Sequence, residues 1–426
     1  MKPRTWLVGP GVAVVALLSL AACGSSSSST AIAPAASAAA SASGPAGAPI
    51  LVGSICSCSG AQASTLAKAG AVSTAWADSL NAAGGLNGHA IKMIVKDDAS
   101  DPAKALQAAK DLVESEHVVA IVGDGSLADQ AFASYVQGKG IPVVGGISLE
   151  LPFLTNPDFF ASGSSIPVIT VGVAAEAKRA AKTKLGVIYC AESPVCAQLD
   201  PVAKGAAALS GLGYTSAKVS ATAPNFTAPC LAMKSAGVDA LFLADAAAVN
   251  QRIAASCSQA GYKPLLVGQI STYASTLATD ANFDGSTFVS PNAPYNERSV
   301  PANQAMRTAF EKYIPGTSSA DDVPPIAATG WYAGQLFEAA SKAAGGFSPT
   351  STPADITKGL YALKGETLGG LSGPLTFTQG KPAFPTCYFT NTISGGKLAD
   401  PQGPAPVCLT AEQATALQGA LASLTG

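Results

Sequence analysis

The sequence predicts an α/β fold built as two lobes, each a mostly parallel sheet with helices on both faces. The chain has 426 residues, which exceeds the usual length of a single domain, about 100–200 residues. Strand-like apolar runs alternate with helix-like segments, and the alternation restarts at Leu185. Because this β-α repetition is typical of parallel sheets covered by helices, two such sheets predict a cleft between them.

Composition excludes two classes of protein. Hydrophobic residue types make up 48% of the chain and charged types 12%, so the chain as a whole is not intrinsically disordered. The 25 basic residues face 27 acidic ones without a basic run. Nucleic-acid binding needs clustered Lys and Arg, so no nucleic-acid partner is expected.

The first residues have the layout of an export signal. Two basic residues precede an apolar run from Trp6 to Leu20, which is shorter than the ~20 residues that span a membrane. The sequence Leu20-Ala21-Ala22-Cys23 resembles a bacterial lipobox. This resemblance implies a lipoprotein signal peptide at 1–22, cleavage before Cys23 and lipidation of its thiol. A plain secretory signal and a membrane anchor are the alternatives.

Residues 23–48 are nearly all Ser, Ala, Gly and Pro. Such a segment cannot bury apolar surface and is typical of a flexible tether, with a reach of about 25–30 Å. We therefore expect an extracytoplasmic protein, held at the outer face of the cell membrane by the lipid on Cys23.

The first sheet and its helices follow directly from the apolar pattern. Ile50 to Ile55 predicts a strand, and a helix follows because apolar residues recur at spacings of three and four: Leu66, Ala69, Val72, Trp76 and Leu80. The segment NAAGGLNG at 81–88 ends that helix, and Ile91 to Val95 predicts a second strand. Asp101 followed by Pro102 gives the N-cap and first-turn signal of a second helix.

The later elements repeat this pattern. Five further apolar runs predict strands: Val118–Val122, Ile141–Val144, Leu185–Tyr189, Ala240–Leu243 and Leu265–Val267. Residues 330–344 predict a packing helix of the first lobe. The stretch from Pro374 to Val407 predicts short antiparallel strands, and Glu412 to Leu424 a final helix.

Nine cysteines in an exported chain favour disulfides, because that compartment lets them persist. Without Cys23 eight remain, and proximity in sequence favours three pairs: Cys190–Cys196, Cys230–Cys257 and Cys387–Cys408. Cys56 and Cys58, one residue apart, are left either as a fourth pair or as free thiols. With two histidines and no paired CxxC motif, no metal is expected.

Enzyme motifs give little support for catalysis. Gly123, Gly125 and Ala128 fit the pattern G-x-G-x-x-A. However, they follow the third predicted strand instead of the first, and no acid stands near Val143 to hold a ribose. The chain has no G-x-S-x-G elbow and no GK[ST] loop. We expect no cofactor and no enzyme activity; an extracytoplasmic hydrolase remains an alternative.

A family resemblance covers nearly everything after Pro49. The segment NAAGGLNGHAIKMIVKDDASDPAKALQAAKDLVESEHVVAIVGDGS, which begins at Asn81, resembles the first lobe of type I solute-binding proteins of ABC importers, branched-chain amino acid subgroup. Four later stretches are similar to the same family: GIPVVGG from Gly140, LGVIYCAESP from Leu185, FTAPCLAMKSAGVDALFLADAAA from Phe226 and GWYAGQLFEAASKAAGG from Gly330.

The resemblance implies a type I periplasmic-binding-protein fold with three crossovers at a hinge. Lobe I would be formed by 49–162 plus 293–365, and lobe II by 163–292 plus 366–426. A small molecule would be gripped between the lobes and delivered to an ABC permease, with no chemistry performed on it. We expect the protein to act as a monomer.

The first-lobe part of the site is expected at two glycine turns. Ligands of open α/β sheets bind beyond the carboxyl ends of strands, where helix N-termini present N–H groups. Two turns are expected there: Gly123-Asp124-Gly125-Ser126, and the turn ending in Ile147 and Ser148. By resemblance they hold the α-carboxylate of an amino acid. The alternative is that they only connect elements.

The second lobe is expected to supply the partner of an ammonium group. Asp245 and Gln269 follow two predicted strands, and a buried ammonium needs such a partner because an unpaired charge costs several kcal/mol. At the position that resembles Gln269, branched-chain binders typically have an acid. The alternative for Asp245 is a helix N-cap. Four further candidates remain. Ser59 and Gln62 are expected on the first-lobe wall, with ordinary capping as the alternative. Glu192 lies in the loop between Cys190 and Cys196, and Tyr273 is an aromatic candidate whose alternative is a core position.

The sequence thus predicts a lipid-anchored receptor that captures a small polar solute, an amino acid or a related carboxylate, for an ABC permease. A membrane-tethered sensor with the same clamp and a structural lipoprotein are the other interpretations of the same pattern.

Overall fold

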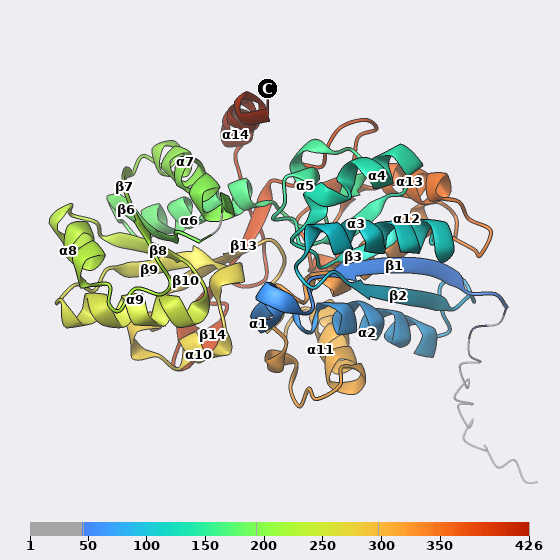
Figure 1. Ribbon diagram of the computed structural model, residues 1–426, viewed down its shortest axis with the longest axis horizontal. Coiled ribbons are helices and arrows are strands. Elements are labelled where there is room, and N and C mark those ends of the chain that lie inside the picture. Colours follow the sequence, from blue (N-terminus) through green and yellow to red (C-terminus); the bar gives the residue numbers. More distant parts are fainter. Residues whose placement is uncertain (1–44, 46, 193, 297, 426) are drawn as a thin grey trace, which may run out of the picture. The chain divides into compact units, whose positions relative to one another are not determined.

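The computed structural model confirms the α/β class. It describes residues 45, 47–192, 194–296 and 298–425 (Figure 1). The predicted signal peptide, Cys23 and nearly all of the tether lie outside the described residues. In the part that is described, no helix is both long enough and apolar enough to cross a membrane.

The first sheet has five parallel strands in the order β2-β1-β3-β4-β5. Its strands are β1 (Ile50–Cys56), β2 (Ile91–Asp97), β3 (Ile121–Asp124), β4 (Val143–Gly146) and β5 (Phe159–Phe160). Helices that arise from two separate parts of the sequence cover this sheet: α1 (Ala63–Leu66), α2 (Ala69–Ala82), α3 (Pro102–Lys110), α4 (Ala133–Lys139), α5 (Pro152–Thr155), α11 (Pro301–Tyr313), α12 (Thr329–Ala343) and α13 (Pro353–Ala362). The predicted packing helix at 330–344 is α12, which lies against β3, β4 and α2.

Local signals explain where these elements begin. The Asp101 side chain accepts hydrogen bonds from the N–H groups of Ala103 and Lys104, and Pro102 opens α3, as predicted. The single helix expected over Leu66 to Leu80 is two helices, α1 and α2.

Strands β3 and β4 begin later than the apolar runs suggested. The N–H of Val118 bonds to a carbonyl at the preceding helix end, and the N–H of Ile141 does the same after α4. Pro142 has no N–H to offer a neighbouring strand. The first residues of both apolar runs therefore connect the preceding helix to the strand and are not part of the strand.

The second sheet has the order β14-β13-β10-β9-β8-β6-β7, with β15 beside β13. Its strands are β6 (Lys184–Cys190), β7 (Gly213–Val219), β8 (Ala240–Ala244), β9 (Leu265–Gln269), β10 (Thr287–Ser290), β13 (Cys387–Ser394), β14 (Lys397–Ala399) and β15 (Val407–Cys408). The strands from β6 to β10 are parallel, and β13, β14 and β15 are antiparallel to their neighbours, as predicted for the tail.

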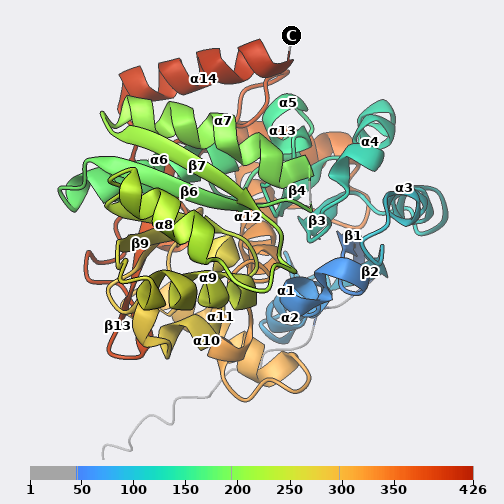
Figure 2. The ribbon, with the colours of Figure 1, turned by 60° about the vertical axis from the view of Figure 1, so that its left-hand side comes forward.

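Strand β8 shows how both faces of this sheet are buried. Leu241 and Leu243 belong to one apolar cluster, whereas Ala240 and Phe242 belong to another, because successive side chains of a strand point to opposite faces. Figure 2 shows α7 on one side of β6 and β7, with α8 and α9 on the other. The helices of this half are α6 (Ile166–Arg179), α7 (Pro194–Leu209), α8 (Thr227–Ser235), α9 (Ala247–Gln259), α10 (Ser275–Ala278) and α14 (Ala411–Thr425).

The chain passes between the two halves three times. One apolar cluster contains buried residues from 50–161 and from 295–383, and it includes the region of the short pair β11 (Lys364–Glu366) and β12 (Leu375–Thr376). The other two clusters draw on 168–289 and on residues from Tyr388 onward. The lobe limits inferred from the resemblance stay a prediction; in these clusters, residues up to Ala383 pack with the first sheet.

Four disulfides are present in the described part of the chain. The three predicted pairs, Cys190–Cys196, Cys230–Cys257 and Cys387–Cys408, are confirmed. Cys56 and Cys58, left open by the sequence, also form a bond, directly where β1 ends.

Candidate functional site

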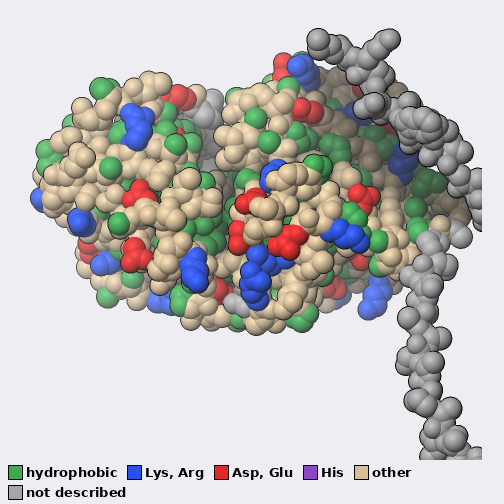
Figure 3. Space-filling model, turned by 90° about the horizontal axis from the view of Figure 1, so that it is seen from below, with side chains coloured by type: hydrophobic (Ala, Val, Ile, Leu, Met, Phe, Trp, Pro, Cys, Tyr) green, Lys and Arg blue, Asp and Glu red, His purple; other side chains and the backbone are tan. Residues whose placement is uncertain are grey.

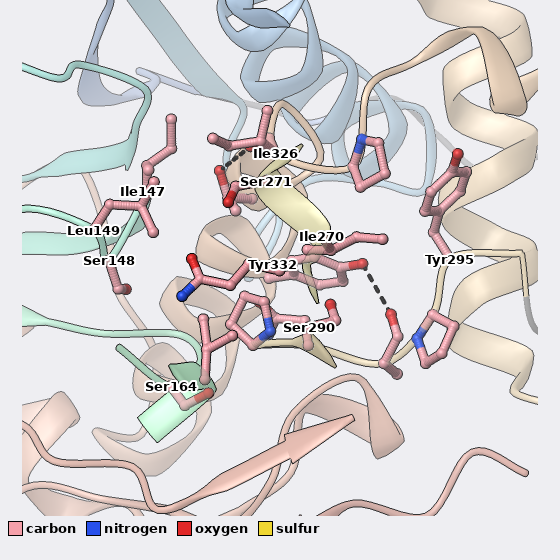
Figure 4. A pocket seen from close by; sticks show the side chains of 18 of the residues that line it. Ile147, Ser148, Leu149, Ser164, Ile270, Ser271, Ser290, Tyr295, Ile326 and Tyr332 are labelled. Carbon is pink, nitrogen blue, oxygen red and sulfur yellow. Dashed lines mark hydrogen bonds between the residues drawn. The ribbon is translucent and has the colours of Figure 1, made fainter. Parts of the chain in front are cut away.

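A hollow opens where strands of both sheets end. Its empty volume is about 580 Å³, which includes open solvent at its mouth. The wall is formed by the turn after β4, the start of α6, the ends of β9 and β10, the loop before α12, and β13 (Figure 4). The lining residues are Ile147, Ser148, Leu149, Ser164, Ile169, Gln269, Ile270, Ser271, Ser290, Pro291, Asn292, Ala293, Pro294, Tyr295, Pro325, Ile326, Thr329, Tyr332 and Asn391.

Three of the predicted ligand-binding residues line this hollow: Ile147, Ser148 and Gln269. The structure brings them together from the ends of β4 and β9, which belong to different sheets. The other predicted residues lie elsewhere: Ser59, Gln62, Gly125, Ser126, Glu192, Asp245 and Tyr273.

The turn after β3 is occupied by its own contacts. The Ser126 hydroxyl donates to Asp98 Oδ2 at 2.6 Å and accepts from the N–H of Ala128 at 2.9 Å. Gly125 forms a bridge with Cys56, and its N–H bonds to the carbonyl of Ile55. The Ser126 hydroxyl, fully buried, thus has both a donor and an acceptor partner within the protein.

Two buried carboxyl groups lie beneath the same turn. Burial raises the pKa of Asp124 to about 7, and burial together with the neighbouring Asp124 charge raises the pKa of Asp129. Oδ2 of Asp124 and both side-chain oxygens of Asp129 meet no donor group among the described residues. Two carboxyl groups this close share a proton more readily than they ionise together, so this turn is a poor receptor for a second anion.

Close packing explains the glycines of the turn after β4. Gly145 has φ +60° and lies against Ala333 of α12, and Gly146 has φ +133° beside the backbone of Asp124. A Cβ at either position would collide with these atoms. The glycines let the chain pass between β3 and α12, and the next residues, Ile147 and Ser148, then reach the hollow.

Ser59 and Gln62 lie together where β1 ends. The Ser100 hydroxyl donates to the carbonyl of Ser59 at 2.9 Å, and Ser100 Oγ accepts from the N–H of Gln62 at 3.1 Å. They connect the loop after β1 to the loop after β2.

Asp245 and Glu192 follow neighbouring strands of the second sheet, β8 and β6. Oδ1 of Asp245 accepts from the N–H of Ala246 at 2.7 Å, while Oδ2 has no hydrogen-bond partner among the described residues. Burial raises the pKa of Asp245. The Glu192 carboxylate accepts from Ser220 Oγ at 2.7 Å, and this contact lowers its pKa. The residue at the N-cap of α9 is Ala246, so Asp245 does not have the capping role considered as its alternative.

Gln269 lies at the hollow, whereas Tyr273 lies inside an apolar cluster. Gln269 Nε2 donates to Thr170 Oγ1 at 2.8 Å, and the residue lines the hollow. The Tyr273 ring packs against Phe288 at 5.5 Å, inside an apolar cluster.

Several lining residues gave no signal in the sequence. Ser164 stands at the entry to α6, and Asn391 lies on β13, in the tail predicted only as short strands. Asn391 reaches the hollow because β13 pairs with β10. An isolated Asn in a strand has no recognisable motif, so only tertiary structure could find it. Tyr332 of α12 also lines the hollow, and its hydroxyl donates to the carbonyl of Ala293 at 3.2 Å.

The described part of the chain contains no group of three or more His, Cys, Asp or Glu side chains arranged to hold a metal. Figure 3 shows basic and acidic side chains interspersed over one face of the molecule. That face therefore presents no continuous basic surface of the kind that tracks a phosphate backbone.

Comparisons with known proteins agree with this architecture. A family model described as "Periplasmic binding protein" matches residues 49–397. An amino acid binding protein of Pseudomonas aeruginosa is 36% identical over 89 residues, which are 21% of this chain and 22% of that protein. The matched segment thus spans about a fifth of that relative.

Three solved structures illustrate the likeness of fold. A branched-chain amino acid ABC transporter protein of Thermus thermophilus with bound valine has a TM-score of 0.73 at 17% identity, covering 88% of this chain and 98% of its own. A fatty acid ABC transporter substrate-binding protein of Thermomonospora curvata scores 0.68 at 18% identity, covering 86% and 94%. A solute-binding protein of R. palustris in complex with benzoate scores 0.65 at 19% identity, covering 86% and 98%.

Proposed function

The chain belongs to the periplasmic binding protein family, and on that premise we propose that it captures a small carboxylate outside the cytoplasm and delivers it to an ABC permease. Members of this family are solute-binding proteins and not enzymes, and the family implies an extracytoplasmic location. The sequence pattern led to an amino acid or a related carboxylate as the solute, and this solute class is part of the proposal.

One observation carries the proposal: the hollow lies at strand ends contributed by both sheets. Ile147 and Ser148 follow β4 of the first sheet, and Gln269 ends β9 of the second. Sites beyond the carboxyl ends of parallel strands are where open α/β sheets bind ligands. The named ligands of the structural neighbours, valine, benzoate and fatty acid, share a carboxylate on an apolar body.

In this proposal the direct contacts are Ile147, Ser148 and Gln269, which line the hollow. The other predicted residues do not line the hollow and are not direct contacts in this proposal. Asp245 and Glu192, which follow β8 and β6, are proposed as partners for a ligand that carries an ammonium group.

The proposal also places the protein at the membrane. The lipidated Cys23 would anchor a monomer through the tether, close to its permease. Mass spectrometry of the membrane fraction tests this part: a diacylglyceryl-modified Cys23 as the first residue is expected, and an unmodified mature chain in the medium would contradict it.

The function is tested by a thermal-shift screen of the mature chain. The panel contains amino acids, aromatic and aliphatic carboxylates, short amides and sugars. A ligand at about 100 times its Kd should stabilise the protein by about 2.7 kcal/mol and raise its Tm. If no compound of the panel changes Tm, and calorimetry detects no binding of any of them, the receptor proposal fails.

Asp245→Asn tests the role proposed for Asp245. If Asp245 meets an ammonium, the substitution weakens an amine-bearing ligand about tenfold or more and leaves an uncharged one unchanged. Equal effects on both ligands would remove Asp245 from that role.

A further inference from the structure

The hollow contains no group that is charged at neutral pH. None of its 19 lining residues is Asp, Glu, Lys, Arg or His. Burial raises the pKa of Tyr332 and Tyr295, so both hydroxyls stay neutral. The wall therefore offers hydrocarbon, hydroxyl and amide groups, with Ile147, Ile270 and Ile326 among its apolar members (Figure 4).

Four acids considered as partners for a cation do not line the hollow: Asp124, Glu150, Asp245 and Asp321. Asp321 is bonded to Arg307 at 2.7 Å. Asp124 lies buried beneath the turn after β3, with its pKa raised by burial, and Glu150 and Asp245 are not among the lining residues. Burying an unpaired ammonium costs several kcal/mol. An amine-bearing ligand would therefore find no charged partner among the residues that line the hollow.

Two polar side chains in the wall lack partners. Ser164 and Asn391 are each 1% exposed. Neither Ser164 Oγ nor the Asn391 side-chain nitrogen and oxygen makes a hydrogen bond within the described part of the chain. Buried polar groups are rarely left without a partner, because each such group costs about 1–3 kcal/mol. Both side chains can donate to a ligand oxygen.

We propose that the hollow binds a molecule with an apolar body and no ammonium group, whose carbonyl or carboxylate oxygen accepts hydrogen bonds from Asn391 Nδ2 and Ser164 Oγ. This inference rests on the proposed function and narrows its ligand class. It assigns Ser164 and Asn391 as binding residues. It also makes Gln269 a determinant of specificity, because an acidic side chain at this position of the wall would attract an amine and the neutral amide does not.

Matched ligand sets test the class by calorimetric titration at about pH 7. One set is L-valine, 3-methylbutanoate and 3-methylbutanamide; the other is L-phenylalanine, 3-phenylpropanoate and 3-phenylpropanamide. Within a set the acid differs from the amino acid only by the ammonium group, and the amide separates a neutral carbonyl from a carboxylate. We expect the acid or the amide to bind about tenfold or more tightly than the amino acid.

The outcomes separate this inference from the proposed function. Amino acids that bind as tightly as their deaminated partners would overturn the inference while leaving the proposed function in place. If no compound of the panel binds, both the proposed function and this inference are overturned.

Variants test the assigned residues. Ser164→Ala and Asn391→Ala should each weaken binding of the acid or amide by about tenfold. Ser286→Ala is the matched control, because Ser286 is 2% exposed and equally without a partner among the described residues, but does not line the hollow. Thermal unfolding of each variant verifies that it is folded. Unchanged affinity in a folded Ser164→Ala and a folded Asn391→Ala would refute the assignment.

Gln269→Glu provides a gain-of-function test. The substitution changes one amide to a carboxylate of the same shape at a position that lines the hollow. It should raise the affinity for L-valine relative to 3-methylbutanoate about tenfold. An unchanged ratio would show that the wall at Gln269 does not determine the preference.

Discussion

Asp124 makes folding stability depend on pH in a direction opposite to that of a surface carboxylate. The side chain is 1% exposed, and burial raises its pKa from 3.8 to about 7 in the folded protein. Between these two values the unfolded chain releases a proton that the folded chain retains. The contribution to stability is therefore complete below about pH 4 and is lost as pH rises to about 7.

The size of the loss follows from the shift. Each pKa unit corresponds to about 1.4 kcal/mol, so the rise from 3.8 to about 7 corresponds to about 4 kcal/mol. Asp124→Asn keeps the side-chain oxygen that accepts from the N–H of Ser126 at 3.1 Å and cannot ionise. The variant should match the wild type near pH 4 and exceed its free energy of unfolding by about 4 kcal/mol near pH 8.

Urea denaturation at both pH values measures this difference. Comparison with the wild type cancels the carboxylates that titrate equally in the two proteins. Asp78→Asn, an exposed position on α2, is the control and should show no such pH-dependent gain. If Asp124→Asn is less stable than the wild type at pH 8, the carboxyl pair is ionised and stabilised in some other way, and the reasoning is refuted.

Two further predictions concern stability. Removing the Cys230–Cys257 disulfide by substitution with Ala should lower the free energy of unfolding by about 3–4 kcal/mol, because this bond closes a loop over a sequence separation of 27. Removing Cys56–Cys58, with a separation of 2, should lower it by about 1 kcal/mol. Denaturant titration of both variants measures the two losses, and equal losses would contradict the loop argument. Gly145→Ala should lose about 2–4 kcal/mol, since φ is +60° and the new Cβ would lie 2.5 Å from that of Ala333. Gly138→Ala is its control: nothing lies within 4 Å of the new Cβ, and Tm should be unchanged or higher.

The alternation of apolar runs and helical periods predicted the α/β architecture because those signals are local. Each strand of a parallel sheet is buried on both faces, so runs such as ALFLA at 240–244 stand out without any knowledge of their neighbours. The N-cap at Asp101 is equally local, since its side chain bonds to N–H groups two and three residues away. Three disulfides followed from proximity in the chain for the same reason.

The sequence predicted residues that line the hollow only where position along a strand sufficed. Ile147 and Ser148 follow β4 of the first sheet, Gln269 ends β9 of the second, and the carboxyl ends of both strands border the hollow. The glycine turn at 123–126 looked equally suitable for an anion. However, Asp124 of the turn lies beside Asp98 and Asp129, which come from outside the motif, and Asp98 accepts the hydrogen bond of the Ser126 hydroxyl. A motif does not show which of its hydrogen bonds are already used.

The sequence by itself determined the class of fold and three of the disulfide pairs, because each depends on residues that are neighbours in the chain. Tertiary structure alone decided which side chains share the hollow. Asn391 and Ser164 are separated by more than two hundred residues, and both line the hollow because β13 pairs antiparallel with β10 and the chain crosses between the halves three times. Such pairing depends on the register of distant strands, which no local pattern encodes.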